Sequence, residues 1–331
     1  MNASCLKAKL PPIFALFVAV SIWQSSIGPA ALAEEDLLDA VLKAHRQSSE
    51  KMESAIGSGT LEVYGKEPDE KEYGLRTKAK VDVQFHQGKY SLRLHYETML
   101  AVSIRTDADG KQTKKFVEDK PDALFVIDDG ASWTEVLFSP RIRPTGCYGT
   151  IHQSDSAPPK IPWRDLAQMG KCIDPETYVK NLGRDKLTVT DLPGGTRRIS
   201  GWMKDSTKAR FELDADPKAG FHITAERVYF EPEKEPMHTR DIIWKNKEGI
   251  WYGEQITKIA HYRNRDGTPS ETRKEVFKYE EFSPNADVKP AVFTLAATGI
   301  PRGAWLVDHR PGAPIPKLYF DGQGLTPERP R

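Results

Sequence analysis

Apolar and polar residues alternate along most of this chain from Thr60 to Phe282. Successive side chains of a β-strand point to opposite faces, so this pattern predicts strands with one apolar face. The clearest case is the pair of runs 81–85 and 90–96, joined by a short turn at His86–Lys89, which predicts a hairpin. Comparable runs separated by turns containing Gly, Asp or Asn occur at 123–128, 133–138, 187–192, 197–203, 209–214, 221–230, 241–245, 250–262 and 274–282. We therefore expect about ten strands, arranged as an antiparallel meander.

Two parts of the chain depart from this alternation. Before Thr60 the apolar positions recur with a period near 3.6, and acidic residues begin the segment, which predicts an amphipathic helix from Glu34 to Gly57 or Gly59. Residues 139–183 form a Pro-rich, Cys-bearing insertion with two short helical stretches, at 161–170 and 174–183. This insertion interrupts the predicted sheet and is expected to lie across it.

The N-terminal 33 residues have the pattern of a secretory signal. Lys7 and Lys9 precede an apolar run of 11 residues, and the small-residue site Ala31–Ala33 follows. A run of this length is short of the roughly 20 residues that span a bilayer as a helix. We expect residues 1–33 to be cleaved, leaving a periplasmic or secreted protein with no transmembrane segment.

Charge excludes some classes of partner. Removing residues 1–33 deletes two lysines from the 48 basic residues and no acids, so 46 basic residues face 47 acidic ones. The two signs are interspersed, and neither a clustered basic face nor a basic amphipathic helix is present, so nucleic acid is not an expected partner.

The size of the predicted sheet implies a bent shape. Ten strands spaced about 4.8 Å apart make a sheet roughly 48 Å wide, whereas one helix is about 10 Å across. The predicted helices cover only part of the apolar face, and the rest is hidden by curling of the sheet, by loops or by a bound apolar molecule. The expected fold class is therefore mainly β (α+β): a strongly bent antiparallel half-barrel wrapped around the N-terminal helix and the short inserted helices.

The end of the strand-rich region carries a resemblance to a known family. The stretch Lys278–Leu295 gives a strand, an elbow at Pro284–Asn285 and then Phe293, and the chain begins with a helix that runs into the Gly-bounded strand 55–65. With the one-sided meander between them, these features resemble the lipoprotein-carrier fold of LolA-, LolB- and LppX-like proteins over residues 34–295. The resemblance implies a concave face that accepts acyl chains. The Pro-rich residues 296–331 are expected to be a wrapping tail outside this fold.

Candidate chemistry is sparse. No nucleophile elbow, zinc-binding His pair or phosphate-binding loop is present, and no cofactor is expected. His95 and Glu97 share a strand face without a third ligand, which does not predict a metal site. Asp308-His309-Arg310 is the one polar triplet that suggests a site, although three charged residues before a Pro-Gly turn are usually surface. Cys147 and Cys172 are the even pair left after processing, and we expect a disulfide, with two buried free thiols as the alternative.

The sequence thus predicts a non-enzymatic, exported binding or carrier protein for a lipid or another hydrophobic molecule in the cell envelope. The first alternative is a structural or protein-interaction module of the envelope whose core is filled by side chains. The second is a secreted hydrolase with an unrecognised site, for which the triplet Asp308-His309-Arg310 is the first location to test. The candidate residues of the hydrophobic cavity are large apolar side chains on the predicted strands: Phe125, Ile127, Trp133, Val136, Trp202, Phe211, Val228 and Phe230.

Overall fold

The computed structural model describes most of the chain from Glu34 onward: residues 34–106, 109, 112–118, 121–153, 187–202, 209–232, 234–263, 267–313 and 317–330. The predicted signal peptide, the helical stretches 161–170 and 174–183, and Cys172 lie outside these residues. The chain divides into two compact units between Ala40 and Val41, inside the α-helix α2 (Glu34–Lys51), and the β-sheet belongs to the second unit. No helix among the described residues has the length and apolar character needed to cross a membrane.

Within the described residues, seventeen strands make up the sheet. The strands are β1 (Ser54–Lys66), β2 (Gly74–His86), β3 (Lys89–Thr106), β4 (Gln112–Glu118), β5 (Ala123–Asp128), β6 (Ser132–Phe138), β7 (Cys147–Gln153), β8 (Thr188–Asp191), β9 (Arg197–Trp202), β10 (Ala209–Asp216), β11 (His222–Phe230), β12 (His238–Lys247), β13 (Ile250–Arg263), β14 (Pro269–Pro284), β15 (Trp305–Asp308), β16 (Lys317–Phe320) and β17 (Leu325–Thr326). The 3-10 helices are η3 (Pro193–Gly195), η4 (Pro217–Ala219), η5 (Pro290–Phe293) and η6 (Leu295–Thr298).

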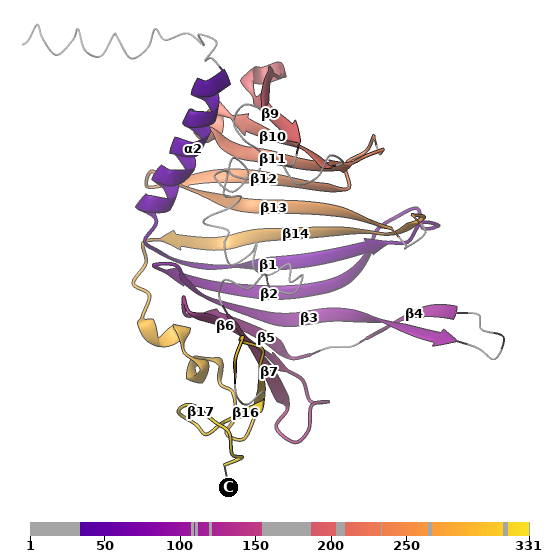
Figure 1. The fold of residues 1–331 in the computed structure, drawn as a ribbon, viewed down its shortest axis with the longest axis vertical. Coiled ribbons are helices and arrows are strands. Elements are labelled where there is room, and N and C mark those ends of the chain that lie inside the picture. Colours follow the sequence, from indigo (N-terminus) through magenta and orange to yellow (C-terminus); the bar gives the residue numbers. More distant parts are fainter. Residues whose placement is uncertain are drawn as a thin grey trace, which may run out of the picture. The chain divides into compact units, whose positions relative to one another are not determined.

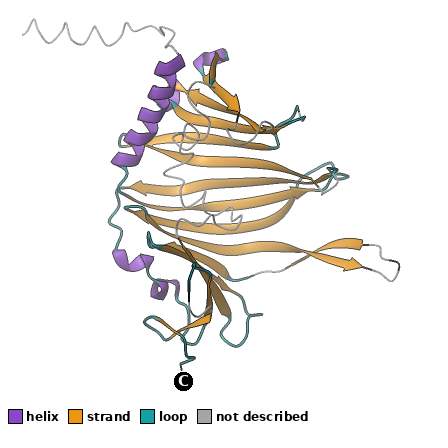
Figure 2. Cartoon of the chain, viewed as in Figure 1, coloured by secondary structure: helices purple, strands orange, loops and turns teal. Residues whose placement is uncertain are grey.

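The strands run in two meanders that meet in the middle of the sheet. From β1 the chain passes through β2, β3, β5 and β6 to β7 on one side, while β8 begins at the opposite edge and the chain returns through β9 to β14. Strand β14 then pairs with β1, although the two are far apart in sequence (Figure 1). Every pairing is antiparallel except that of β7 with β15. The result is one large open, curved sheet and not a closed barrel, as Figure 2 shows.

The prediction of a mainly β protein built on an antiparallel meander is confirmed, but the expected number of about ten strands is wrong. The missing strands lack the alternation on which the prediction depended. Strand β4 is rich in charged residues, and its pairing among the described residues is with the far end of β3. Strand β7 lies within the region read as an insertion, and β15, β16 and β17 lie within the region read as a wrapping tail.

The helix also ends earlier than predicted, because the two glycines expected to end it lie in the strand that follows. Helix α2 stops at Lys51 and β1 begins at Ser54, so Gly57 and Gly59 lie inside the strand. A Cβ atom at Gly57 would lie 2.5 Å from the ring of Tyr279, and one at Gly59 would meet the backbone of Lys278. These glycines therefore permit the close approach of β14 to β1.

The elbow after β14 is fixed by one asparagine. Asn285 has a φ of 50°, a left-handed conformation that Asn adopts more readily than most residues. Its side-chain Nδ2 donates to the carbonyl of Lys51 (2.9 Å), and its Oδ1 accepts from the backbone N–H of Glu53 (3.0 Å). The elbow thus joins the end of β14 to the link between α2 and β1. Beyond it Phe293 is buried against Ile127 of β5.

Candidate functional site

One face of the central sheet is almost entirely apolar, and we call it the apolar face. Directly paired residues of neighbouring strands lie on the same face, so the ladders assign each side chain. Its buried members on the central strands are Ala55, Leu61, Val63, Ala79, Val81, Val83, Tyr90, Leu92, Leu94, Tyr96, Leu124, Val126, Ile256, Phe277, Tyr279 and Phe282. From β14 to β6 the face crosses five strand spacings, or about 24 Å. It is broad enough to receive an extended acyl chain, since the whole two-leaflet hydrocarbon core of a bilayer is about 30 Å thick.

The apolar face becomes polar at β6. Glu135 follows Leu92 and Val126 in the same cross-strand row, so its carboxyl group lies next to buried aliphatic side chains. Burial raises the pKa of Glu135. Burial also raises the pKa of Tyr96 on the same face, and the negative charge of Glu135 adds to this shift. The carboxyl group and the phenol are therefore held toward their uncharged forms.

Trp133 lies two residues before Glu135 on the same face and is only 3% exposed. Its ring stacks on that of His152 with centroids 4.0 Å apart, and His152 stacks in turn on His309 at 4.9 Å. The indole Nε1 of Trp133 is buried and has no hydrogen-bond partner within the described part of the chain. Burial, with a smaller effect of His309, lowers the pKa of His152. The end of the apolar face thus presents polar groups: the indole of Trp133, the imidazole of His152 and the carboxyl groups of Glu135 and of Asp128, which is buried and pairs directly with Trp133.

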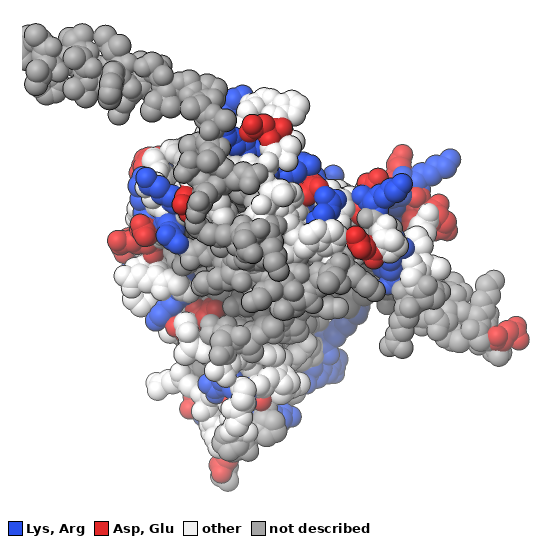
Figure 3. Space-filling model, turned by 45° about the horizontal axis from the view of Figure 1, so that its top comes forward, with Lys and Arg blue, Asp and Glu red and all other residues white. Residues whose placement is uncertain are grey.

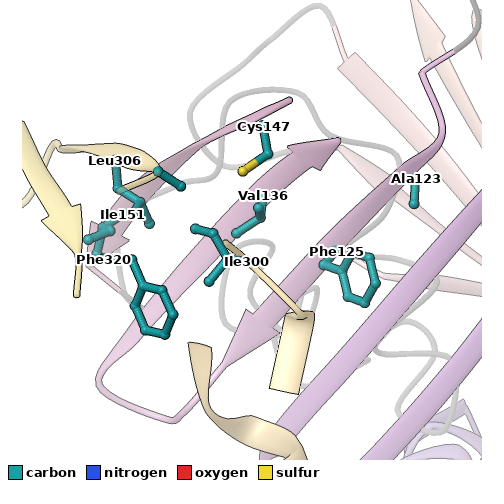
Figure 4. Close-up of a cluster of buried hydrophobic side chains, with 9 residues drawn as sticks. Ala123, Phe125, Val136, Cys147, Ile151, Ile300, Leu306 and Phe320 are labelled. Carbon is teal, nitrogen blue, oxygen red and sulfur yellow. The ribbon is translucent and has the colours of Figure 1, made fainter. Parts of the chain in front are cut away.

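Three of the predicted cavity residues lie on the opposite face. Phe125, Ile127 and Val136 are buried there, because the chain after β14 covers them. Figure 4 shows Ile300 of that later segment beside Val136, with Phe125 and Phe320 of the same cluster on either side. The expectation that only one face of the sheet is apolar is therefore wrong at β5 to β7. These three side chains belong to a packed core.

The other predicted cavity residues are divided between the two faces. Trp133 and Phe211 lie on the apolar face and are buried, whereas Val228 is half-buried there. Phe230 is 41% exposed, and Trp202 is 40% exposed on the opposite face. Because β3, β2, β1, β14, β13 and β12 separate β5 from β11, the sheet does not bring the eight residues into one site.

Cys147 is a buried free cysteine at the start of β7. The predicted disulfide is therefore not found, and its expected partner, Cys172, lies outside the described residues. Burial raises the pKa of the Cys147 thiol. Since reactive cysteines are usually accessible and have a lowered pKa, this thiol resembles a structural core residue.

The triplet Asp308-His309-Arg310 forms a local ion pair and a ring stack. Arg310 donates from Nε and Nη2 to the two carboxylate oxygens of Asp308, at 2.9 and 2.6 Å. These bonds outweigh burial and lower the pKa of Asp308. The backbone N–H of His309 donates to Ile151, and its ring stacks on His152. The triplet fastens β15 to β7 and does not form a nucleophile–base pair.

A groove of about 380 Å³ lies on the polar face of the central strands. Side chains of β14, β1, β2 and β3 form its floor, and Val292 and Ala297 of the 3-10 helices line one side. Arg93 reaches into it with its guanidinium 4.3 Å from the ring centroid of Phe125. This groove is mixed in character and lies on the opposite side of the sheet from the apolar face.

A network of charged side chains on β9, β10 and β11 was not anticipated from the sequence. Asp214 accepts two bonds from Arg198, at 2.7 and 3.0 Å, and one from Arg227 at 2.6 Å. Burial raises the pKa of Asp214, but the two guanidinium groups outweigh it and the net shift is downward. The alternating charges of ARFELD and FHITAERVYF carried this signal, because directly paired strands place opposite charges together.

Metal binding and long-range charge add nothing to this site. The described residues contain no cluster of three or more His, Cys, Asp or Glu side chains that could hold a metal ion. His95 is exposed and contacts Phe125 edge to face. In the view of Figure 3, Lys and Arg side chains lie among Asp and Glu side chains, in line with the net charge of +1.

No protein-family model matches this chain, and neither does any curated protein sequence. Solved structures with a similar fold include a domain described as an outer membrane lipoprotein-sorting protein from Vibrio parahaemolyticus, at 11% identity and a TM-score of 0.44 over 78% of this chain and 97% of that one. A DUF1329 family protein from Desulfovibrio piger is similar at 12% identity and a TM-score of 0.38, over 78% and 98% of the two chains. A third is the MucA/MucB complex of Pseudomonas aeruginosa, at 10% identity and a TM-score of 0.21, over 76% and 99%. A lipoprotein-sorting domain, the class named by the sequence resemblance, is thus among the similar structures.

Proposed function

We propose that this protein is a non-enzymatic binding or carrier protein of the cell envelope that holds an apolar molecule, such as an acyl chain, against the apolar face of its sheet. The observation that carries the proposal is the continuity of that face. In the rows through Leu92 and Leu94, buried apolar side chains of β14, β2, β3 and β5 lie on either side of two glycines of β1, and no charged residue intervenes. An apolar ligand would replace the part of the protein that buries these side chains when no ligand is bound.

The energetics of such binding are sufficient. Burial of one methylene group contributes about 0.8 kcal/mol, so ten buried methylenes contribute about 8 kcal/mol. A dissociation constant of about 1 μM corresponds to about 8 kcal/mol. Any ordering of the protein on binding subtracts from this sum, so ten buried methylenes give at most micromolar affinity, which suits a carrier that must release its ligand.

The export signal predicted at residues 1–33 is the basis for the proposed envelope location. The absence of catalysis is proposed on the geometry of the triplet at 308–310, whose carboxylate is held by Arg310. An envelope protein partner that delivers or receives the apolar molecule would be consistent with this role.

A second candidate function is that of a structural or interaction module with a filled core. It is favoured by the packing around Leu306, where the chain's own C-terminal segment fills the space beside Phe125 and Ile151. If the apolar face is filled in the same way, no guest is needed.

Native mass spectrometry of the protein purified from envelope fractions, followed by lipid extraction, distinguishes the two functions. The carrier proposal predicts co-purifying acyl lipid and a rise in the midpoint of thermal unfolding when oleate is added to the delipidated protein. An empty protein whose thermal midpoint is unchanged by oleate would exclude the carrier function and favour the filled module.

A further inference from the structure

The apolar face ends in polar groups that have no function in a purely aliphatic site. Trp133, Glu135 and His152 lie at this end, on β6 and β7. Buried polar groups in native proteins are almost always hydrogen-bonded, and each exception calls for an explanation such as a missing ligand. The identity of these groups therefore bears on the ligand.

The indole of Trp133 is a hydrogen-bond donor only. Its Nε1 is buried and finds no acceptor among the described residues. Leaving such a donor unsatisfied costs about 1–3 kcal/mol, and a ligand oxygen in contact with it would recover part of this. His152 fixes the orientation of the ring by stacking on it at 4.0 Å.

Glu135 stands two residues, or about 7 Å of strand rise, further along β6 and on the same side of the sheet. Its cross-strand neighbour is Val126, and Leu92 follows in the same row. No described cation pairs with it. A negatively charged ligand group would be repelled by the ionised form of this carboxyl, whereas an uncharged oxygen-bearing group can accept from its protonated form.

Taken together with the apolar row beside them, these groups have the chemistry of an amphiphile site. We propose that the ligand is a lipid with an uncharged, ester-bearing head, whose acyl chain lies on the apolar face and whose ester carbonyl accepts a hydrogen bond from Trp133 Nε1 beside Glu135. This inference rests on the proposed function, because it assumes that the acyl chain occupies the apolar face.

The test compares two probes with the same hydrocarbon chain: 1-monooleoylglycerol, and its ether analogue 1-O-oleylglycerol, which lacks the carbonyl. Their affinities for the full-length mature protein are measured by displacement of a fluorescent fatty acid. We expect the ester to bind about five- to tenfold more tightly, the range expected for one additional buried hydrogen bond. Trp133→Phe, which keeps the stacking but removes the donor, should abolish this preference, whereas Trp202→Phe on the opposite face should preserve it.

A second measurement does not depend on the Trp133 variant being folded. A lysophosphatidylglycerol with the same oleoyl chain should bind the unaltered protein more weakly than monooleoylglycerol, because its phosphate is charged. Glu135→Gln, which is close in shape and uncharged, should narrow this difference at pH 8.

The outcomes distinguish an error in the proposed ligand class from an error in the proposed function. Equal binding of ester and ether by the unaltered protein, or a preference for the phosphate-headed lipid that Glu135→Gln leaves unchanged, would overturn the inference while the carrier function stands. Failure of all three lipids to bind would overturn the proposed function itself.

Discussion

Replacing Asn285 by alanine tests whether the elbow after β14 depends on this side chain. The change removes two side-chain hydrogen bonds, to Lys51 and Glu53, which span more than 230 residues of sequence. Both bonds are exposed, so each is expected to contribute about 0.5 kcal/mol, the low end of the usual range. Alanine in the left-handed conformation at a φ of 50° costs about 1 kcal/mol more. The sum predicts a loss of about 2 kcal/mol in the free energy of unfolding.

Urea unfolding followed by far-ultraviolet circular dichroism measures this loss, with Asn246→Ala as the matched control. Asn246 also uses its side chain in a turn, where Oδ1 accepts from the N–H of Gly249 at 3.0 Å. Its own φ is not positive, so its replacement should cost only about 0.5 kcal/mol. Equal losses for the two variants would refute the assignment of the elbow to Asn285.

Three further predictions concern packing, pH dependence and charge. Leu306 is fully buried, so Leu306→Ala should lower the free energy of unfolding by about 3 kcal/mol, measured by urea unfolding, whereas Leu325→Ala at a 39% exposed position should change it by less than about 0.5 kcal/mol. Burial lowers the pKa of His152 below 6.5, so protonation of this residue favours the unfolded chain. The contribution of His152 to the free energy of unfolding should be complete above pH 6.5 and should fall as the pH drops below that value. The free energy of unfolding of the protein minus that of His152→Gln, measured between pH 5 and 8, should show this fall, and a flat difference would contradict the assignment. Asp214→Asn should lower the free energy of unfolding by about 2 kcal/mol, because it removes the carboxylate that Arg198 and Arg227 share and leaves Arg198 only its ion pair with Glu212. A loss that disappears in 1 M salt would instead indicate a purely surface interaction.

The strands that could be predicted from the sequence are those with one apolar face. The alternation in 81–85 and 90–96 defined a hairpin, which the structure places at β2 and β3. Strand β7 could not be found in this way, because Gly149 interrupts its apolar positions and one of its two partners, β15, comes from a distant part of the chain. Pairing between β1 and β14 was equally invisible, since alternation assigns a residue to a strand but not a strand to its neighbour.

The candidate site was predicted only in outline. The alternation within one strand shows which residues share a face, but not which face a distant segment covers. Phe125 and Val136 were therefore predicted to line a cavity, whereas the structure places them in a core with Phe320. Glu135 was overlooked because a carboxyl group among apolar residues was read as the polar half of the alternation. Its parity with Trp133 in the run WTEVLF was the available signal.

Photo-crosslinking with a diazirine-labelled oleic acid tests the central claim most directly, because it reports which face of the sheet the acyl chain contacts. Adducts are mapped by mass spectrometry to single residues of β3, where neighbouring positions lie on opposite faces. The account predicts labelling of Leu92 and Leu94, with protection by unlabelled oleate. Labelling confined to Ser91, Arg93 and the groove beside Val292, or no labelling that oleate suppresses, would contradict it.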